Sequence, residues 1–255
     1  MPVSVQAWPA VVSLLRDGSY WYAEYGWPSS PDEQLWNETV HTLGQILEHR
    51  LRTDDSLSLE ERLCVLSSLE QLAGIGLENA HRASLVYAEV DRLFGAGVSC
   101  RSLRERALWL TLLASCNMWL DDADYTAAAL ALARDMLARP TADAVEEAMV
   151  LTAVNGYAYR MLDHRFDDEL AVRVAALLQH TPAHADDTES LSARYAFFSQ
   201  GVSFAVPRAV LQQLAREATV RLETVRPGDE DWYRLASLCV NYAYEFAEAE
   251  IEYKV

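Results

Sequence analysis

The sequence predicts an all-α protein built from stacked antiparallel pairs of helices. Apolar residues recur with the 3.6-residue period of a helix, and polar breaks separate one periodic run from the next. No segment shows the alternating pattern of a half-buried strand. Short strings of residues also return at spacings of 38 to 46 positions, depending on the anchor chosen. Repetition at this period is typical of helix pairs that bury a shared core by stacking.

The repeats are clearest where the first helix of a pair begins. The string Ser-Leu-Glu-Glu-Arg at 58–62 returns 44 residues later, at 102–106, as Ser-Leu-Arg-Glu-Arg. The string at 107–111 returns after 41 residues at 148–152. Ser58 and Glu61 have the spacing of a capping box, which predicts a helix start at that point.

The predicted helices follow in order along the chain, ten to eleven in all. We expect a helix at 3–16 that stops at Asp17-Gly18-Ser19, a non-repeating aromatic segment at 20–27, and a helix at 32–52. The helices after residue 57 are 59–73 paired with 77–94, 103–120 with 125–138, 144–163 with 167–180, 188–204 with 207–225, and a final 230–253. Prolines fall between these pairs, where a residue without an N–H does not interrupt a helix.

This pattern resembles the αα-solenoids of HEAT- and TPR-like repeat proteins over about residues 57–252. The resemblance concerns architecture alone, because the TPR alanine, glycine and aromatic positions do not recur in register. It implies one domain over residues 1–255, with 1–56 as N-terminal helices and an aromatic cap and 57–255 as helix-pair repeats. A compact bundle of orthogonal helices is the alternative.

Charge and composition restrict the function. The net charge is −17, and Lys254 is the only lysine, so we expect no nucleic-acid partner and a basic protein as the partner. No run reaches the ~18 apolar residues that a membrane span needs, and no secretory signal is recognisable at the start. The four cysteines are scattered, which favours a reducing cytoplasm. We expect no cofactor.

A candidate partner-binding surface comes from amides inside the apolar first helices, with aromatic residues around the later ones. If these helices line an inner curve, the side chains form a groove with aromatic anchors. The acidic final helix adds three glutamates on one face. Alternatively, the amides bond across helices within the core. The partner-binding candidates are Asn117, Trp119, Asn155, Tyr157, Tyr159, Tyr195, Gln200, Asn241, Tyr242, Tyr244, Glu245, Glu248 and Glu252.

One alternative is an all-α enzyme with a carboxylate site. The string Asp121-Asp122-Ala123-Asp124-Tyr125 resembles the aspartate-rich motif of class I terpene synthases, which implies Mg²⁺ and a diphosphate held by Asp121, Asp122 and Asp124. The second metal motif of that family has no match in the chain. The string also lies at the break between two helices, where aspartate caps the next helix.

A second enzyme hypothesis uses two Glu-x-x-His pairs, Glu38 with His41 and Glu78 with His81. Pairs of this kind bind two metal ions in some helical bundles. A further alternative is a regulator that senses a small ligand in a cavity lined by aromatic residues. The favoured hypothesis is a non-enzymatic repeat protein, of inhibitor, immunity or adaptor type, that binds a basic protein.

Overall fold

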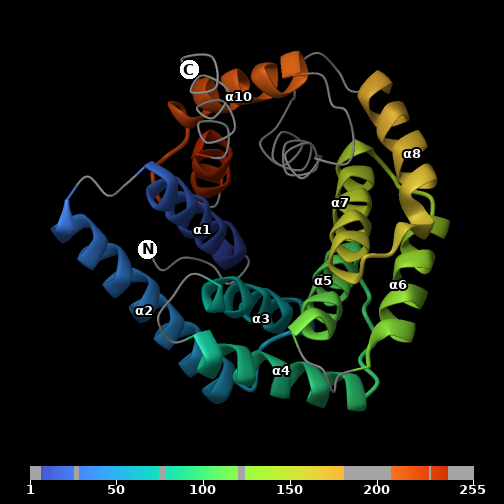
Figure 1. Cartoon of the computed structure of the whole chain (residues 1–255), viewed down its shortest axis with the longest axis horizontal. Coiled ribbons are helices and arrows are strands. Elements are labelled where there is room, and N and C mark those ends of the chain that lie inside the picture. Colours follow the sequence, from blue (N-terminus) through green and yellow to red (C-terminus); the bar gives the residue numbers. More distant parts are fainter. Residues whose placement is uncertain are drawn as a thin grey trace. The chain divides into compact units, whose positions relative to one another are not determined.

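The computed structural model describes residues 7–25, 29–74, 79–119, 124–180, 208–229 and 231–240. All regular secondary structure in these residues is helical, which confirms the all-α prediction (Figure 1). The chain divides into two compact units, Met1–Glu89 with Ala215–Val255 and Val90–Leu214. The labelled helices are α1 (Trp8–Tyr25), α2 (Ser30–Thr53), α3 (Leu59–Ala73), α4 (Asn79–Gly95), α5 (Leu103–Trp119), α6 (Thr126–Ala138), α7 (Ala144–Met161), η2 (His164–Phe166), α8 (Asp167–His180) and α10 (Arg208–Leu222).

In the unit Val90–Leu214, α5 and α7 pack side by side, α6 contacts both, and α8 packs against α7 (Figure 1). Residues 112–116 of α5 are all buried, so the middle of this helix is enclosed on every side. In contrast, α8 buries Leu170, Val174 and Leu177, which lie on a single helical face. The first helices of the pairs are therefore central, and the second helices cover them.

In the unit Met1–Glu89 with Ala215–Val255, α3 holds the central place. It packs against α1 and α2, and residues 63–69 of α3 are all buried. Residues 231–240 are helical and return to α1, where the hydroxyls of Ser13 and Ser237 share a hydrogen bond of 3.3 Å. Each unit thus surrounds an apolar first helix among its described residues.

Capping boxes begin α3 and α5, as the sequence predicts for Ser58. The Ser58 hydroxyl accepts from the Glu61 N–H, and the Glu61 carboxylate accepts from the Ser58 N–H at 2.9 Å. The Glu105 N–H donates to the Ser102 hydroxyl at 3.0 Å, and the Ser102 N–H donates to the Glu105 carboxylate at 3.1 Å. At the start of α7, Asp143 accepts from two backbone N–H groups at 2.9 Å each. The recurrence in the sequence is therefore a recurrence of helix starts.

In the three helix pairs that the structure describes on both sides, an ion pair ties the start of the first helix to the middle or later part of the second. The charged residue on the first helix lies four positions after the residue that caps that helix. The three pairs are Arg62–Glu89 (2.8 Å), Arg106–Asp135 (3.5 Å) and Glu147–Arg173 (2.6 Å). A contact between the start of one helix and the later part of the next is what an antiparallel pair requires. In the third pair the charges are exchanged, with the acid on the first helix.

The predicted break at residues 17–19 is wrong. α1 begins at Trp8 and continues through Asp17, Gly18 and Ser19 to Tyr25, so most of the aromatic segment is helical in its backbone. One glycine inside a helix costs about 1 kcal/mol. The packing of α1 against α3 outweighs that cost. The predicted helix 188–204, and 241–253 of the last one, lie outside the described residues.

Candidate functional site

The described surface has one unusual backbone position, at the end of α7. Leu162 follows the last helical residue with φ 49° and ψ 41°, in the left-handed region, and its side chain is 78% exposed. The Asp163 N–H donates to the Ala158 carbonyl at 2.9 Å, and the Leu162 N–H donates to that of Tyr159 at 3.4 Å. This is a helix end at which glycine is the usual residue. A leucine there adopts a conformation that bulky side chains rarely have.

Asp163 fixes the turn that follows. Its carboxylate accepts from the Tyr157 hydroxyl at 2.9 Å and from Nε and Nη2 of Arg165 at 2.7 and 2.6 Å. The Arg165 hydrogen bonds lower the pKa of Asp163 to about 2, and burial together with Asp163 raises the pKa of Tyr157 to about 12. Arg165 itself remains more than half exposed. The turn therefore presents a guanidinium group that is held in place.

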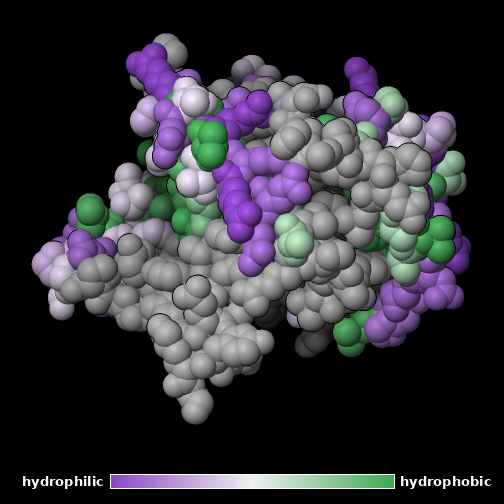
Figure 2. Space-filling view, turned by 90° about the horizontal axis from the view of Figure 1, so that it is seen from above, coloured by the Kyte–Doolittle hydropathy of each residue, from purple (hydrophilic) through white to green (hydrophobic). Residues whose placement is uncertain are grey.

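Two large apolar side chains are exposed beside this turn. Tyr159 is 76% exposed on the last turn of α7, three residues before Leu162. We call Tyr159, Leu162 and the turn up to Arg165 the α7–α8 corner. Figure 2 shows that described hydrophobic side chains on one face form separate patches among hydrophilic ones. Tyrosine and arginine are both enriched among the residues that dominate binding energy at protein interfaces.

Acidic side chains continue the corner into α8. Asp167, Asp168 and Glu169 form its first turn, and all three are exposed. His164 lies 3.0 Å from Asp167. Carboxylates at a helix N-terminus also interact favourably with the helix dipole, which accounts for part of their presence. An exposed apolar pair followed by three carboxylates can contact a segment that carries both apolar and cationic groups.

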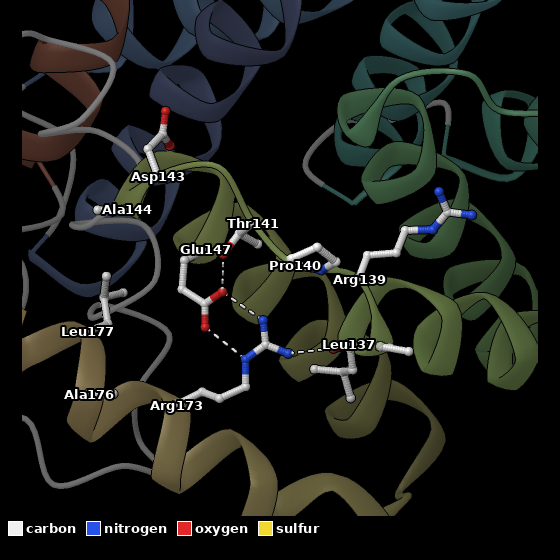
Figure 3. A pocket seen from close by; sticks show the side chains of 11 residues that line it. Leu137, Arg139, Pro140, Thr141, Asp143, Ala144, Glu147, Arg173, Ala176 and Leu177 are labelled. Atoms are coloured by element: carbon white, nitrogen blue, oxygen red, sulfur yellow. Dashed lines mark hydrogen bonds and ion pairs between the residues drawn. The ribbon is translucent and has the colours of Figure 1, made fainter.

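The opposite end of the α7–α8 pair holds a groove of ≈ 640 Å³. Glu147, Thr141 and Arg173 point toward one another in it, whereas Arg139 and Asp143 extend away (Figure 3). Arg173 donates twice to Glu147 and once to the Leu137 carbonyl, and the Arg173 hydrogen bond lowers the pKa of Glu147. The same pair recurs in the other helix pairs, so its polar groups serve the packing of α7 on α8. The apolar lining residues are Leu137, Ala138, Pro140, Ala144, Ala176 and Leu177.

The structure separates the predicted partner-binding residues. The Asn117 carbonyl oxygen accepts from the Tyr125 N–H at 2.8 Å, so this amide holds the turn into α6. Asn155 is buried, and Tyr157 is fully buried and bonded to Asp163. Of the candidates with described side chains, Tyr159 is the one on the surface. Trp119 ends α5. Tyr195, Gln200, Asn241, Tyr242, Tyr244, Glu245, Glu248 and Glu252 lie outside the described residues.

The aspartate-rich string is only partly described. Asp121 and Asp122 lie outside the described residues, whereas Asp124 is exposed and accepts from the Thr126 N–H at 3.3 Å. The N-cap position of α6 is held by Tyr125, so Asp124 forms a local turn just before the helix and not the cap that the sequence predicts. Tyr125 closes the string. It is buried, packs edge-to-face on Phe94 with ring centroids 4.8 Å apart, and donates to Asp91 at 3.1 Å.

The Glu-x-x-His pairs are placed on α2 and α4. Glu38 is exposed and accepts from Gln34 at 2.8 Å, and the His41 carbonyl accepts from Arg82 at 3.4 Å. His81 is exposed, with its Nε2 3.5 Å from Glu48. Glu78 lies outside the described residues. Within the part of the chain that the structure describes, no three His, Cys, Asp or Glu side chains gather as metal ligands would.

Sequence reasoning missed Leu162, Asp163 and Arg165. A signal was available, because the stretch after Tyr159 contains neither the glycine nor the asparagine that usually ends such a helix.

Comparison with protein-family models, curated proteins and solved structures finds no match to this chain. None of the helices among the described residues is both long and apolar enough to cross a membrane.

Proposed function

We propose that this protein is a non-enzymatic helical-repeat protein that binds a basic protein, as an inhibitor of the immunity type or as an adaptor. The observation that carries the proposal is the charge of −17, with one lysine and with carboxylates exposed in succession at the start of α8. Such a surface attracts cationic partners over distances longer than a direct contact and accelerates their association.

The environment of the perturbed groups supports a binding role. Catalytic groups are often recognised by shifted pKa values. Here the pKa shift at Asp163 follows from Arg165 and that at Glu147 from Arg173, and each of these pairs holds one helix or turn against another. The pKa values of the Tyr125 and Tyr157 hydroxyls are raised to about 12 by burial and by hydrogen bonds to carboxylates. These groups stabilise the scaffold.

The scaffold also suits a binding protein. Enclosed first helices with capped starts and ion-paired second helices form a rigid support, so surface side chains keep their positions before a partner arrives. A cytoplasmic location belongs to the proposal, because all four cysteines are free thiols, as a reducing compartment favours.

The test is the salt dependence of partner binding. The tagged protein is used to isolate partners from its source cells at low salt, and the Kd of the purified partner is then measured between about 50 and about 300 mM salt. We expect a partner of basic isoelectric point whose Kd rises at least about tenfold over this range, since exposed charges are screened. A neutral or acidic partner, or a Kd that does not respond to salt, contradicts the proposal.

A further inference from the structure

The strain at Leu162 has no compensation within the described fold. A glycine at this helix end forms the same backbone hydrogen bonds without the steric cost of a β-carbon. The leucine side chain is 78% exposed, so burial does not offset that cost. Strained backbone positions that stability does not explain are concentrated at functional sites. The stability of the described fold therefore does not explain a leucine at this position.

Tyr159 is exposed at the same helix end as Leu162. The Leu162 N–H donates to the Tyr159 carbonyl, so the two residues belong to the same helix end, and both side chains are mostly exposed. Tyrosine contributes a large rigid ring at a low cost in conformational entropy, which is why it is frequent among residues that dominate binding energy. The helix end thus exposes two large side chains with apolar surface, Tyr159 and Leu162.

The corner is rigid before any partner binds. Asp163 is almost buried, and it holds Arg165 through two hydrogen bonds and the Tyr157 hydroxyl through one. The Asp163 N–H bond to the Ala158 carbonyl closes the helix end. A partner therefore meets a surface that loses little freedom on binding.

Charge complementarity selects the occupant. Asp167, Asp168 and Glu169 follow the corner directly and are all exposed, with Asp167 3.0 Å from His164 and Glu169 3.8 Å from Arg173. Residues 159–169 carry four carboxylates against the two arginines Arg160 and Arg165, so a segment that seats an apolar side chain at Leu162 meets a surface with an excess of negative charge. Cations on that segment pair with these carboxylates, whereas an acidic segment is repelled.

Given the proposed function, we infer that the α7–α8 corner is its docking surface. It receives a short amphipathic segment of the basic partner, with a large apolar side chain on Tyr159 and Leu162 and flanking arginine or lysine on the first turn of α8. The apolar contact supplies most of the affinity and the carboxylates supply the salt dependence. This division distinguishes the corner from a diffuse acidic surface.

The experiment measures the Kd of the full chain for a synthetic amphipathic helical peptide of leucine and arginine, by fluorescence anisotropy. Two control peptides carry serine in place of leucine, or glutamate in place of arginine. The protein variants are L162A, L162G and Y159A, with L35A as the matched control, because Leu35 is a similarly exposed leucine on α2.

We expect L162A, L162G and Y159A each to weaken binding about tenfold or more at fixed salt, and L35A to leave it unchanged. The serine peptide should bind the wild type about tenfold or more weakly than the leucine–arginine peptide does, and the glutamate peptide should not bind. The triple variant D167N/D168N/E169Q should retain the apolar contribution and lose most of the salt dependence.

The inference is overturned if L162A and L162G bind like the wild type, if L35A loses as much as they do, or if the wild type does not bind the leucine–arginine peptide. Self-association that L162A abolishes would overturn it too, by making a second copy the occupant. Loss of folding is excluded by L162G, which should be more stable than the wild type. If a basic partner binds the wild type and the corner variants with the same salt-dependent Kd, that result overturns docking at the α7–α8 corner and leaves the proposed function intact.

Discussion

The guanidinium group of Arg82 in α4 occupies the space in which a β-carbon on Gly44 of α2 would lie. Arg82 is 1% exposed, and it donates from Nε to Glu48 at 3.1 Å and from Nη2 to the His41 carbonyl at 3.4 Å. A buried arginine is stable only when its donors are paired, so Gly44 permits the contact that satisfies it.

Gly44→Ala should destabilise the protein by about 1–3 kcal/mol, because the added methyl group displaces the buried guanidinium from Glu48. The free energy of unfolding in urea measures this change. Gly95→Ala is the matched control, since a β-carbon there meets no atom within 4 Å. Equal stability of G44A and G95A would show that α2 and α4 do not pack through this contact.

Leu162→Gly should raise the free energy of unfolding by about 1 kcal/mol, because it removes the steric cost of a β-carbon in the left-handed region. Leu162→Ala keeps the β-carbon and should leave stability unchanged. Thermal unfolding of the two variants makes the comparison. A destabilised L162G would mean that the leucine side chain has a structural role.

The stability contribution of Asp163 should disappear in acid. Arg165 lowers the pKa of Asp163 from 3.8 to about 2 in the folded protein, so the contribution is present above about pH 4 and is lost as the pH falls toward 2. We expect it to be about 1 kcal/mol, after screening of the exposed Arg165. Unfolding of the wild type and D163N between about pH 6 and pH 2 measures it. If the difference in unfolding free energy between the wild type and D163N grows as the pH falls, the predicted direction of this pH dependence is wrong.

The exchanged charges of Glu147 and Arg173 can be tested by a double-mutant cycle. E147R and R173E should each destabilise by about 2–4 kcal/mol, since each leaves a partly buried charge beside a like charge. The double variant should recover at least about half of the combined loss, because Arg62–Glu89 and Arg106–Asp135 already have that polarity. Full recovery is not expected, since a glutamate at 173 cannot donate to the Leu137 carbonyl. Additive losses would show that the pair does not interact.

Much of the architecture could be predicted from local signals. The helix start at Ser58 is marked by a capping box, and α3 and α8 begin and end where periodicity and breakers place them. The continuation of α1 through Gly18 could not be predicted from sequence, because the cost of one glycine is small beside packing that only the tertiary structure supplies.

The binding surface was harder to predict than the fold. Tyr157 and Tyr159 are two residues apart, which places them about 200° apart around a helix. The Tyr157 side chain is therefore buried, with its hydroxyl bonded to Asp163, and the Tyr159 side chain faces solvent. Which of the two is exposed depends on the neighbours of α7 in space. The left-handed backbone of Leu162 likewise depends on how the chain turns from α7 into α8.

Hydrogen exchange of the full chain, with and without the leucine–arginine peptide, tests docking at the α7–α8 corner most directly. We predict added protection of backbone amides over residues 159–169, lost at high salt and absent with the glutamate peptide. Protection elsewhere in the chain with none at 159–169, or protection that the glutamate peptide equally produces, would contradict docking at the corner.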